Sequence, residues 1–469
     1  MVLAAGQGKR MRSNLPKVLH EVGGLPMLFH ILLRVREASP DASVALIVGH
    51  GRELVEKAVR ECDLFNGMDI QFVLQSEQKG TGHAARCAMD SPWGEAVVKA
   101  KVPVLVLPGD SPLLTRSLIE QMLAPLARTA SMRLLTTELP VPTGYGRIVR
   151  RGKAGPVLRI VEEKDATVRE KAIREVGASI YFFNSSFMKV GLSRITNKNA
   201  QGEYYLTDLI SQASKGKGKI EVLAWPEFED LSGANDPWDL AGIDRLVNER
   251  HIRALAKGGV KIVNPWNTRI DTTVKVAEGA TVMPGAILLG RTTVGAGATI
   301  GANVHLKNME IGEHAYVKVG TVGEDSIIGA HAQVGPYAHF RPESKVGAHS
   351  KIGNFVELKK ATIGANTSIS HLSYLGDAEV GERVNIGCGF VTCNFDGRVI
   401  NGSRKHKTII EDDVFMGSDC QTVAPVKVGR GSFVASGSTI TENVEPDSLA
   451  IARSRQVNKV GYAKKLRNP

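Results

Sequence analysis

A glycine-containing segment close to the start of the chain has the composition of a phosphate-binding loop. The segment reads Leu3-Ala4-Ala5-Gly6-Gln7-Gly8-Lys9-Arg10-Met11, and Pro16-Lys17 follows it. Two glycines allow the backbone to approach a phosphate and to direct its amides at it. The cations of Arg10 and Lys17 would neutralise a departing pyrophosphate. The segment predicts a nucleotide-phosphate site, with a simple strand-to-helix turn as the structural alternative.

A carboxylate follows an apolar run in the same half of the chain. Residues 104–107 lead into Pro108-Gly109-Asp110, so that Asp110 is predicted at the carboxyl end of a parallel strand, where open sheets bind ligands. Hard oxygen ligands, completed by phosphates and water, suit magnesium better than a transition metal. Asp110 is therefore the candidate magnesium ligand, and a helix cap before Ser111 is the alternative.

A third candidate is His371 in the C-terminal half. Residues 356–360 and 370–377 place polar and bulky side chains in an otherwise aliphatic and small-residue stretch, which suggests a groove. A neutral imidazole can take the proton that an amine loses as it attacks a thioester. The alternative is a surface histidine, because the chain has 12 histidines in all.

The elements that would position the first two candidates alternate up to about residue 230. Strands are predicted at residues 44–48 and 102–107, and helices at residues 53–60 and 118–127. This alternation is typical of a doubly wound, mostly parallel, Rossmann-like α/β sheet. A connecting helix is predicted from Asp239 to about Lys257, ended by Gly258-Gly259.

Beyond that helix, an aliphatic residue followed by glycine recurs at spacings of six residues or close to multiples of six. The positions are Val294, Ile300, Ile311, Val322, Ile328, Val334, Val346, Ile352, Ile363, Val380 and Ile386, and the pattern resumes at Val428, Val434 and Ile440. This period suits short strands that turn at fixed corners with the aliphatic side chain pointing inward. The interruption at residues 397–407 is predicted to be an external loop.

The composition limits the classes of function. The chain has 469 residues, of which 43% are hydrophobic and 23% charged, so two domains are expected. No apolar run approaches the roughly 20 residues that span a bilayer, and the start leads directly into a loop instead of a signal peptide, which favours a cytoplasmic protein without membrane contact. Five scattered cysteines indicate neither disulfides nor a zinc site. The net charge of +11 suits polyanionic small molecules, and the lack of an aromatic-studded basic tract argues against nucleic acid.

Both halves resemble known families. The hexad pattern of residues 265–455 resembles the left-handed β-helix acyltransferases, although sugar pyrophosphorylases also carry such β-helices as oligomerisation modules. The N-terminal loop, with residues 75–83, resembles the nucleotide-sugar pyrophosphorylase signature. Together with the segments around His371 and Arg453, nearly the whole chain resembles the family of bifunctional N-acetylglucosamine-1-phosphate uridyltransferases and glucosamine-1-phosphate acetyltransferases.

For the first site, the resemblance implies a uridylyl transfer in which N-acetylglucosamine-1-phosphate attacks the α-phosphorus of UTP and pyrophosphate leaves. Arg10 and Lys17 are the implied catalytic cations, and Asn235 is the implied second Mg²⁺ ligand beside Asp110. The implied substrate-binding residues are Leu3, Ala4, Ala5, Gly6 and Lys17 in the loop, Gln75, Gly80 and Thr81 for the pyrimidine base, Gly146 and Glu162 for the sugar, and Asn235.

For the second site, the resemblance implies an acetyl transfer with His371 as the base. The residues implied for glucosamine-1-phosphate are Arg341, Lys359, Tyr374 and Asn385, and those for acetyl-CoA are Cys388, Asn394, Phe395, Ser418, Ser436 and Arg453. The family is trimeric, with its acetyl site between neighbouring β-helices. A homotrimer is therefore expected.

Some positions depart from the family pattern. The first strand begins at Met1, where family members usually have several preceding residues, so the true start lies upstream or the strand is short. An expected sugar-contacting Asn is replaced by Gly177. At the second site, Cys388 stands for a small Ala and Phe395 for a Tyr, whose hydroxyl contact is lost. The loop at residues 398–407 is longer than expected and would reshape the acetyl-CoA entrance.

The predicted organisation is a nucleotidyltransferase domain at residues 1–235, a connecting helix at 236–260 and a β-helix acetyltransferase domain with a tail at 261–469. The leading hypothesis is a bifunctional enzyme that makes UDP-N-acetylglucosamine. A single-activity sugar-1-phosphate nucleotidyltransferase with a β-helix for oligomerisation is the alternative, against which His371, Asn394 and Arg453 argue. A scaffold without chemistry is the third, against which Arg10 and Asp110 argue.

Overall fold

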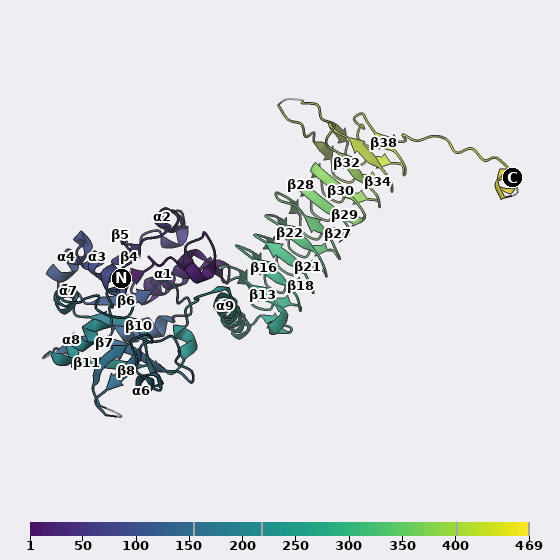
Figure 1. Cartoon of the computed structure of the whole chain (residues 1–469). Coiled ribbons are helices and arrows are strands. Elements are labelled where there is room, and N and C mark those ends of the chain that lie inside the picture. Colours follow the sequence, from purple (N-terminus) through teal and green to yellow (C-terminus); the bar gives the residue numbers. More distant parts are fainter. Residues whose placement is uncertain (153–154, 217–218, 400–401, 468–469) are drawn as a thin grey trace. The chain divides into compact units, whose positions relative to one another are not determined.

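The chain forms two compact units, Met1–Val247 and Asn248–Pro469, which are described separately. The computed structural model describes residues 1–152, 155–216, 219–399 and 402–467 (Figure 1). The boundary between the units lies within helix α9 (Pro237–Lys257), which is the helix predicted between the domains. Gly259, at a φ of +90°, follows its end.

The first unit is built on one mixed sheet. Its strands run in the order β11-β7-β10-β6-β1-β4-β5, with β8 and β9 beside β10. Strands β1, β4, β5 and β6 are parallel, whereas β10 is antiparallel to its neighbours β6 and β7. The strands are β1 (Val2–Leu3), β4 (Val44–Val48), β5 (Ile70–Leu74), β6 (Val104–Pro108), β7 (Ala130–Glu138), β8 (Arg147–Arg150), β9 (Val157–Val161), β10 (Glu175–Phe183) and β11 (Lys219–Ala224).

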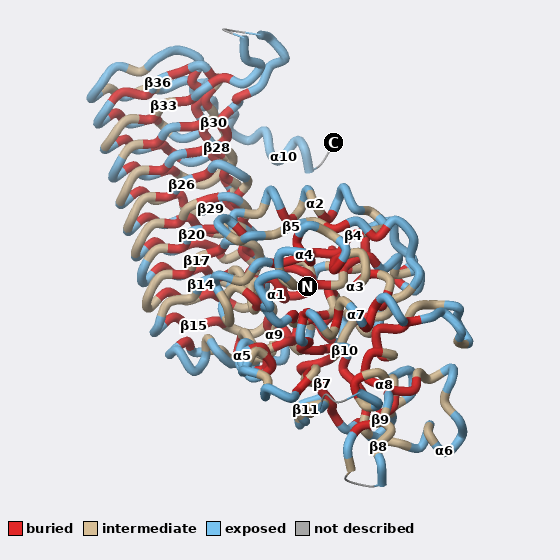
Figure 2. The backbone as a smooth tube through the Cα atoms, turned by 90° about the vertical axis from the view of Figure 1, so that its left-hand side faces the viewer, coloured by how far each residue is buried: buried red, intermediate tan, exposed pale blue. Residues whose placement is uncertain are grey.

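Helices cover both faces of this sheet because its central strands are apolar on both sides. In β4, Val44, Leu46 and Val48 pack into one hydrophobic core, while Ala45 and Ile47 pack into the other. Continuous burial of this kind is typical of parallel strands between two helical layers, and in Figure 2 the strands are largely buried while the helices beside them carry intermediate and exposed residues as well. The helices are α1 (Met27–Ala38), α2 (Arg52–Arg60), α3 (Thr81–Met89), α4 (Pro92–Lys99), α5 (Arg116–Leu123), α6 (Val168–Lys171), α7 (Ser185–Leu192) and α8 (Asp208–Lys215).

One predicted helix end was wrong. The helix predicted at residues 118–127 is α5, which begins at Arg116 and ends at Leu123. Ala124 has an extended ψ of 143° because the ring of Pro125 excludes the helical conformation for the residue before it. Thr115 caps the other end by accepting a hydrogen bond from the Leu118 amide at 3.2 Å.

The second unit is a parallel β-helix. Thr281 lies beside Thr299, which is 18 residues later, and Lys351 lies beside Ser368, which is 17 residues later, so that each coil pairs in parallel with the next. Its short strands run from β12 (Lys261–Ile262) to β39 (Leu449–Ala450). The ones that carry the site are β27 (Lys351–Asn354), β28 (Glu357–Ile363), β29 (Ser368–His371), β30 (Tyr374–Val380), β31 (Asn385–Ile386) and β32 (Val391–Cys393).

The aliphatic residue of the hexads points inward as predicted at every position except Val322. The others are buried, whereas the Val322 side chain is 44% exposed. At this coil Gly323 faces the interior, and the Met309 side chain fills the space that a Cβ at Gly323 would enter. The long, flexible side chain of methionine suits such an irregular gap.

Among the residues that the structure describes, no helix is long and apolar enough to cross a membrane. The five cysteines are all free thiols. The prediction of scattered thiols without a disulfide framework is confirmed.

Candidate functional sites

The N-terminal loop is shaped by close packing between Gly8 and Lys17. Gly8 has a φ of +60°, and a Cβ there would come within 2.7 Å of the Lys17 Cβ. Gly6, in contrast, would meet nothing within 4 Å, so this part of the backbone faces open space. Position 8 requires glycine because of its backbone conformation, whereas no contact within the protein requires glycine at position 6. The open backbone at Gly6 is suited to the approach of a phosphate.

The structure brings the two predicted cations and the two predicted metal ligands together. Lys17 Nζ forms an ion pair with Asp110 Oδ2, and Arg10 Nη2 donates a hydrogen bond to Asn235 Oδ1 at 2.8 Å. The backbone of Gly233 passes the carboxylate so closely that a Cβ there would lie 3.6 Å from Asp110 Cγ. These contacts join the end of β6 to the segment that precedes α9.

Asp110 and Asn235 fit the chemistry of a magnesium ion. Their ligand atoms are a carboxylate oxygen and an amide oxygen, which are hard donors, and these two side chains accept hydrogen bonds from Lys17 and Arg10. No group of three or more His, Cys, Asp or Glu side chains that could hold a metal occurs in the described part of the chain. A protein that offers two oxygen ligands leaves the other positions to phosphate and water, as magnesium usually requires.

Two pockets meet at Asp110. One, of about 390 Å³, is lined by the N-terminal loop together with Gln75, Gly80 and Thr81. The other, of about 330 Å³, is lined by Arg10, Asn235, Gly146 and Glu162 among others. Pro108, Asp110 and Ser179 line both pockets. Two ligands in these pockets would meet beside the carboxylate of Asp110.

The first of these pockets holds the residues predicted to bind the base. Gln75 follows β5 directly and is only 4% exposed, and its Nε2 donates to the Gly80 carbonyl at 3.1 Å. Thr81 Oγ1 accepts a hydrogen bond from the Leu206 amide at 3.2 Å, which ties the start of α3 to the segment 201–208. A Cβ at Gly80 would lie 2.6 Å from the Tyr204 carbonyl, so only glycine fits there.

The second pocket holds Gly146 and Glu162. Thr207 Oγ1 donates a hydrogen bond to Glu162 Oε1 at 3.0 Å. Burial raises the pKa of Glu162 above its usual value, and the Thr207 hydrogen bond partly opposes this. Glu162 is therefore a carboxylate that gains from a hydroxyl donor, which a sugar would supply. Gly146 lies beside it, and a Cβ there would come within 2.6 Å of Ile160 and 3.5 Å of Glu162 Oε2, so that a larger residue would not fit.

Ser179 is a residue of this pocket that the sequence analysis did not single out. It lies in a bulge of β10 between Gly177 and Tyr181, has a φ of +58°, and is exposed in an otherwise buried strand. Burial raises the pKa of the nearby Tyr181 hydroxyl, and the Ser179 side chain partly opposes this. Gly177, where the family's Asn is missing, is buried against Ile160. The polar side chain that β10 directs into this pocket is thus Ser179, two residues after Gly177.

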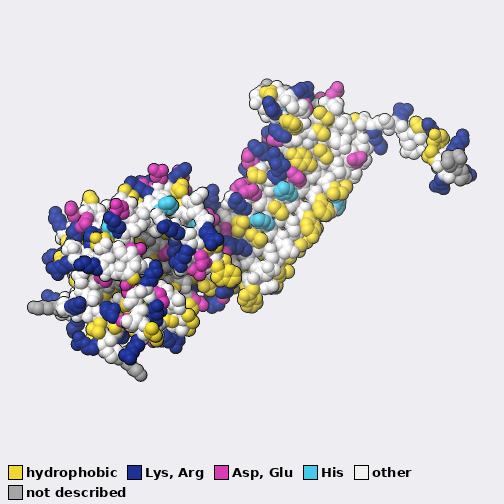
Figure 3. Space-filling model, in the orientation of Figure 1, with side chains coloured by type: hydrophobic (Ala, Val, Ile, Leu, Met, Phe, Trp, Pro, Cys, Tyr) yellow, Lys and Arg dark blue, Asp and Glu magenta, His cyan; other side chains and the backbone are white. Residues whose placement is uncertain are grey.

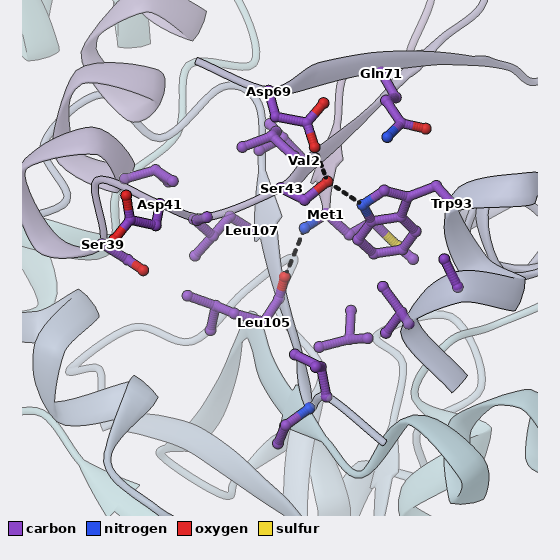
Figure 4. A pocket seen from close by; sticks show the side chains of 18 of the residues that line it. Met1, Val2, Ser39, Asp41, Ser43, Asp69, Gln71, Trp93, Leu105 and Leu107 are labelled. Atoms are coloured by element: carbon purple, nitrogen blue, oxygen red, sulfur yellow. Dashed lines mark hydrogen bonds between the residues drawn. The ribbon is translucent and has the colours of Figure 1, made fainter. Parts of the chain in front are cut away.

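A cavity of about 760 Å³, larger than either of these pockets, lies elsewhere in this unit (Figure 4). It is lined by the amino-terminal ends of the strands, including Val44 and Val104, and by Trp93, whose Nε1 donates to Ser43 Oγ at 3.1 Å. The backbone nitrogen of Met1 donates to the Leu105 carbonyl at 2.9 Å at its rim. None of the predicted site residues lines this cavity, so it is not where the chemistry is expected.

The candidate base of the second unit is held by a neighbouring coil. His371 lies at the end of β29, paired in register with Asn354 of β27. The ring Nδ1 lies 2.5 Å from Asn354 Oδ1. Sequence analysis missed Asn354, although 17 residues, the length of one coil, separate it from His371.

The residues predicted to hold glucosamine-1-phosphate lie on adjacent coils. Arg341 Nη1 forms an ion pair with Glu357 Oε1 at 3.2 Å, and Glu357 lies in register beside Tyr374. Lys359 lies beside Gly376, where a Cβ would meet the Tyr374 hydroxyl at 2.3 Å. Arg341, Lys359 and Tyr374 therefore share one wall. Asn385 lies on the next coil of another wall, beside Ser368.

The residues predicted for acetyl-CoA fall into two groups. The first group lies on successive coils and consists of Ser418 against Gly387, Ser436 against Gly417 and Arg453 against Gly437. Cys388 precedes this group, and its carbonyl accepts a hydrogen bond from the Asp419 amide at 2.7 Å. Asn394 is buried, with Nδ2 donating to Asp377 Oδ2 at 2.5 Å.

Phe395 begins the loop that interrupts the hexads. Its ring is 56% exposed and lies 4.4 Å from Lys405 Nζ. The Arg398 guanidinium beside Asp396 lowers the pKa of that carboxyl to about 2, so a negative charge is fixed next to Phe395 at neutral pH. The predicted reshaping by residues 398–407 includes residues 400 and 401, which lie outside the described residues.

A column of exposed apolar side chains runs past His371. Tyr337, Phe355 and Leu372 occupy equivalent corners of successive coils, each with a positive φ and each more than half exposed. The rings of Tyr337 and Phe355 stack with centroids 5.6 Å apart. Figure 3 shows hydrophobic side chains gathered along the coils on the face in view.

Known proteins match both halves of the chain. Residues 1–148 match the family described as MobA-like NTP transferase domain. Residues 325–360 match the family described as Bacterial transferase hexapeptide (six repeats), and residues 407–442 match the Hexapeptide repeat of succinyl-transferase.

Curated relatives match from end to end. A protein named Bifunctional protein GlmU from Trichlorobacter lovleyi is 43% identical over 471 residues, covering 100% of this chain and 98% of the relative. Proteins of the same name from Sorangium cellulosum and Listeria monocytogenes are 44% and 42% identical, covering 100% and 99% of this chain and 96% and 98% of the relatives.

Proposed function

The chain belongs to the family of bifunctional GlmU proteins, and we propose that its two units carry out successive transfers that produce UDP-N-acetylglucosamine, a precursor of the cell wall. It is a nucleotidyltransferase and a hexapeptide acetyltransferase in one chain. The second unit would acetylate glucosamine-1-phosphate with acetyl-CoA. The first unit would join the resulting N-acetylglucosamine-1-phosphate to UTP and release pyrophosphate.

The observation that carries the uridylyl half is the meeting of two pockets at Asp110. We assign UTP to the pocket of Gln75 and Thr81 and the sugar phosphate to the pocket of Glu162. The two phosphates then meet beside Lys17 and Arg10, where their mutual repulsion would be neutralised for an in-line attack. An ionised phosphate needs no protein base to attack.

The family carries out nucleotide-sugar synthesis with a divalent metal, and we propose Mg²⁺ held by Asp110 and Asn235. When bound, the ion would stabilise the negative charge of the UTP phosphates. In the structure these two side chains already bind Lys17 and Arg10. Both cations therefore lie close enough to the proposed metal site to bind the phosphates of UTP as well.

For the acetyl half, we propose His371 as the base that takes the proton of the attacking amine. Arg341 and Lys359 share a wall with Tyr374 and would bind the sugar phosphate. The columns of Ser418, Ser436 and Arg453 would bind acetyl-CoA.

We propose that the enzyme is a homotrimer assembled through its β-helix and that it acts in the cytoplasm, on small molecules alone. The column of Tyr337, Phe355 and Leu372 supports the trimer, because exposed apolar side chains stacked beside a catalytic residue are expected to be covered by another copy. One chain would then supply only part of each acetyl site.

The deciding experiment supplies the full-length enzyme with one sugar phosphate at a time, together with Mg²⁺, UTP and acetyl-CoA. With N-acetylglucosamine-1-phosphate, UDP-N-acetylglucosamine and pyrophosphate should form without CoA release. With glucosamine-1-phosphate, CoA release should precede the nucleotide sugar. Uridylyl transfer without any CoA release would instead support the single-activity alternative.

A further inference from the structure

The side-chain amide of Gln75 is held by two contacts, and both involve its nitrogen. Nε2 lies 3.1 Å from the Gly80 carbonyl and 3.1 Å from His83 Nδ1. A carbonyl can only accept, so the group that faces Gly80 must be the NH₂ and not the oxygen. The amide orientation of Gln75 is thereby determined by the backbone at Gly80.

The second contact determines the tautomer of His83. Because an amide nitrogen can only donate, His83 Nδ1 must accept, and the ring is neutral with its hydrogen on Nε2. That hydrogen points to Cys87 Sγ, 3.8 Å away and one turn further along α3. Both nitrogens of the ring therefore have compatible partners.

With both hydrogens of its amide used inside the protein, Gln75 has only Oε1 to offer a ligand. Gln75 lines the pocket to which we assign UTP and is 96% buried, so it can reach a ligand only there. A group restricted to accepting pairs with the N3–H of uracil, whereas cytosine presents an acceptor at N3. A buried mismatch of two acceptors is disfavoured because neither group is satisfied.

We propose that His83 is a positioning residue that fixes the Gln75 amide with Oε1 toward the nucleotide and so selects uracil over cytosine. This rests on the proposed uridylyl reaction. Without an acceptor at position 83, one hydrogen of the amide is free and the side chain can turn to offer a donor. Loss of one such constraint should reduce the preference for UTP over CTP about fivefold, as one hydrogen bond is worth about 1 kcal/mol.

The test compares kcat/KM for UTP and for CTP in the full-length enzyme, with N-acetylglucosamine-1-phosphate saturating. His83→Leu should lower the UTP/CTP ratio about fivefold, through a higher KM for UTP with kcat within about twofold. His83→Gln, which restores a carbonyl acceptor, should recover most of the ratio. Cys87→Ala removes the other partner of the same ring and should leave the ratio close to that of the wild type.

Pyrophosphate release with UTP reports whether the first unit of each variant has folded, because acetyl transfer takes place in the other unit. An unchanged ratio in a uridylyl-active His83→Leu, or an equal loss in His83→Gln, would overturn the proposal. If the wild type fails to use UTP at all, the proposed function itself fails, and this is seen before any variant is compared.

A measurement on the wild type does not depend on the folding of a variant. In ¹⁵N-histidine NMR, the His83 ring, assigned by its absence from the His83→Gln spectrum or by its contact with Cys87, should carry its hydrogen on Nε2 at neutral pH. A hydrogen on Nδ1 would contradict the proposal, because that ring could not accept from Gln75.

Discussion

His371 Nδ1 lies 2.5 Å from the side-chain oxygen of Asn354, one coil earlier in the β-helix. The amide oxygen can only accept, so Nδ1 carries the hydrogen and Nε2 has a free lone pair. The neutral ring is thus presented as a base, in an orientation set by a residue that need not contact substrate.

Replacement of the base should separate the two activities. We expect His371→Ala to abolish acetyl transfer, measured as CoA release, while pyrophosphate release from UTP and N-acetylglucosamine-1-phosphate continues at the wild-type rate. His349, exposed on the same β-helix, provides a matched control as His349→Ala. Loss of both activities in a folded protein would show that the sites are not divided as proposed.

Removal of the Asn354 side chain should slow acetyl transfer without ending it. We expect Asn354→Ala to lower kcat about 10- to 100-fold, because the ring loses the partner that fixes its tautomer. Asn354→Asp keeps the acceptor, and its charge favours the protonated ring, so the acidic limb of the pH–rate profile should move to higher pH. A profile that does not move would exclude direct coupling between the two side chains.

Asp110 should be essential for uridylyl transfer alone. We expect Asp110→Ala and Asp110→Asn to lower magnesium-dependent pyrophosphate release by about a hundredfold or more, since each removes a charged metal ligand. CoA release should be unchanged. Asp41→Asn, at the other cavity of the same sheet, is the control. A normal uridylyl rate in Asp110→Asn would remove Asp110 from the metal site.

The ionised Glu162 carboxylate is predicted to lower the stability of the first unit and to favour binding of the sugar phosphate. Its folded pKa lies above the ordinary value of 4.5, so between these two pKa values the folded chain binds more protons than the unfolded one, and stability falls as pH rises. Glu162→Gln should therefore stabilise the first unit to denaturant above that window and have little effect below pH 4.5. The KM for the sugar phosphate should rise about tenfold. If Glu162→Gln changed the free energy of unfolding by the same amount above this window and below pH 4.5, the burial of this charge would be contradicted.

The conformation of Ser179 can be tested by two substitutions that both remove its hydroxyl. Ser179→Ala keeps a side chain at a φ of +58°, whereas Ser179→Gly does not. We expect the Gly variant to be more stable than the Ala variant by about 1 kcal/mol in urea unfolding. A more stable Ala variant would show that the left-handed conformation is not maintained in solution.

The fold could be predicted where one period dominates the sequence. The all-apolar run of β4 and the hexads of the β-helix predict directly which side chains are buried, and the inward residues are buried as expected. Two predictions failed. Val322 is exposed because Met309 occupies the interior, and α5 is shortened by Pro125, which lies inside the helix predicted at residues 118–127.

The site could be predicted where its residues belong to one continuous motif. Lys17 and Asp110 each stand in a recognisable segment, and they form an ion pair. Asn354 and Ser179 were missed for physical reasons. Asn354 contacts a residue of the neighbouring coil, and the length of a coil varies, so the partner of Asn354 depends on how the two coils pair. Ser179 reaches the pocket only because a bulge turns it out of β10.

The parallel register of the β-helix has a consequence for how mutations in it should be interpreted. Side chains that cooperate here, such as Asn354 and His371, are neighbours down a column and not along the chain. Neighbouring coils of 17 and 18 residues pair in register, so extra residues between strands are tolerated. An inserted or deleted residue within a strand would instead move the later side chains of that strand to the opposite face and separate partners on adjacent coils. Tolerance to length changes in this half of the protein should therefore be greatest between strands and lowest within them.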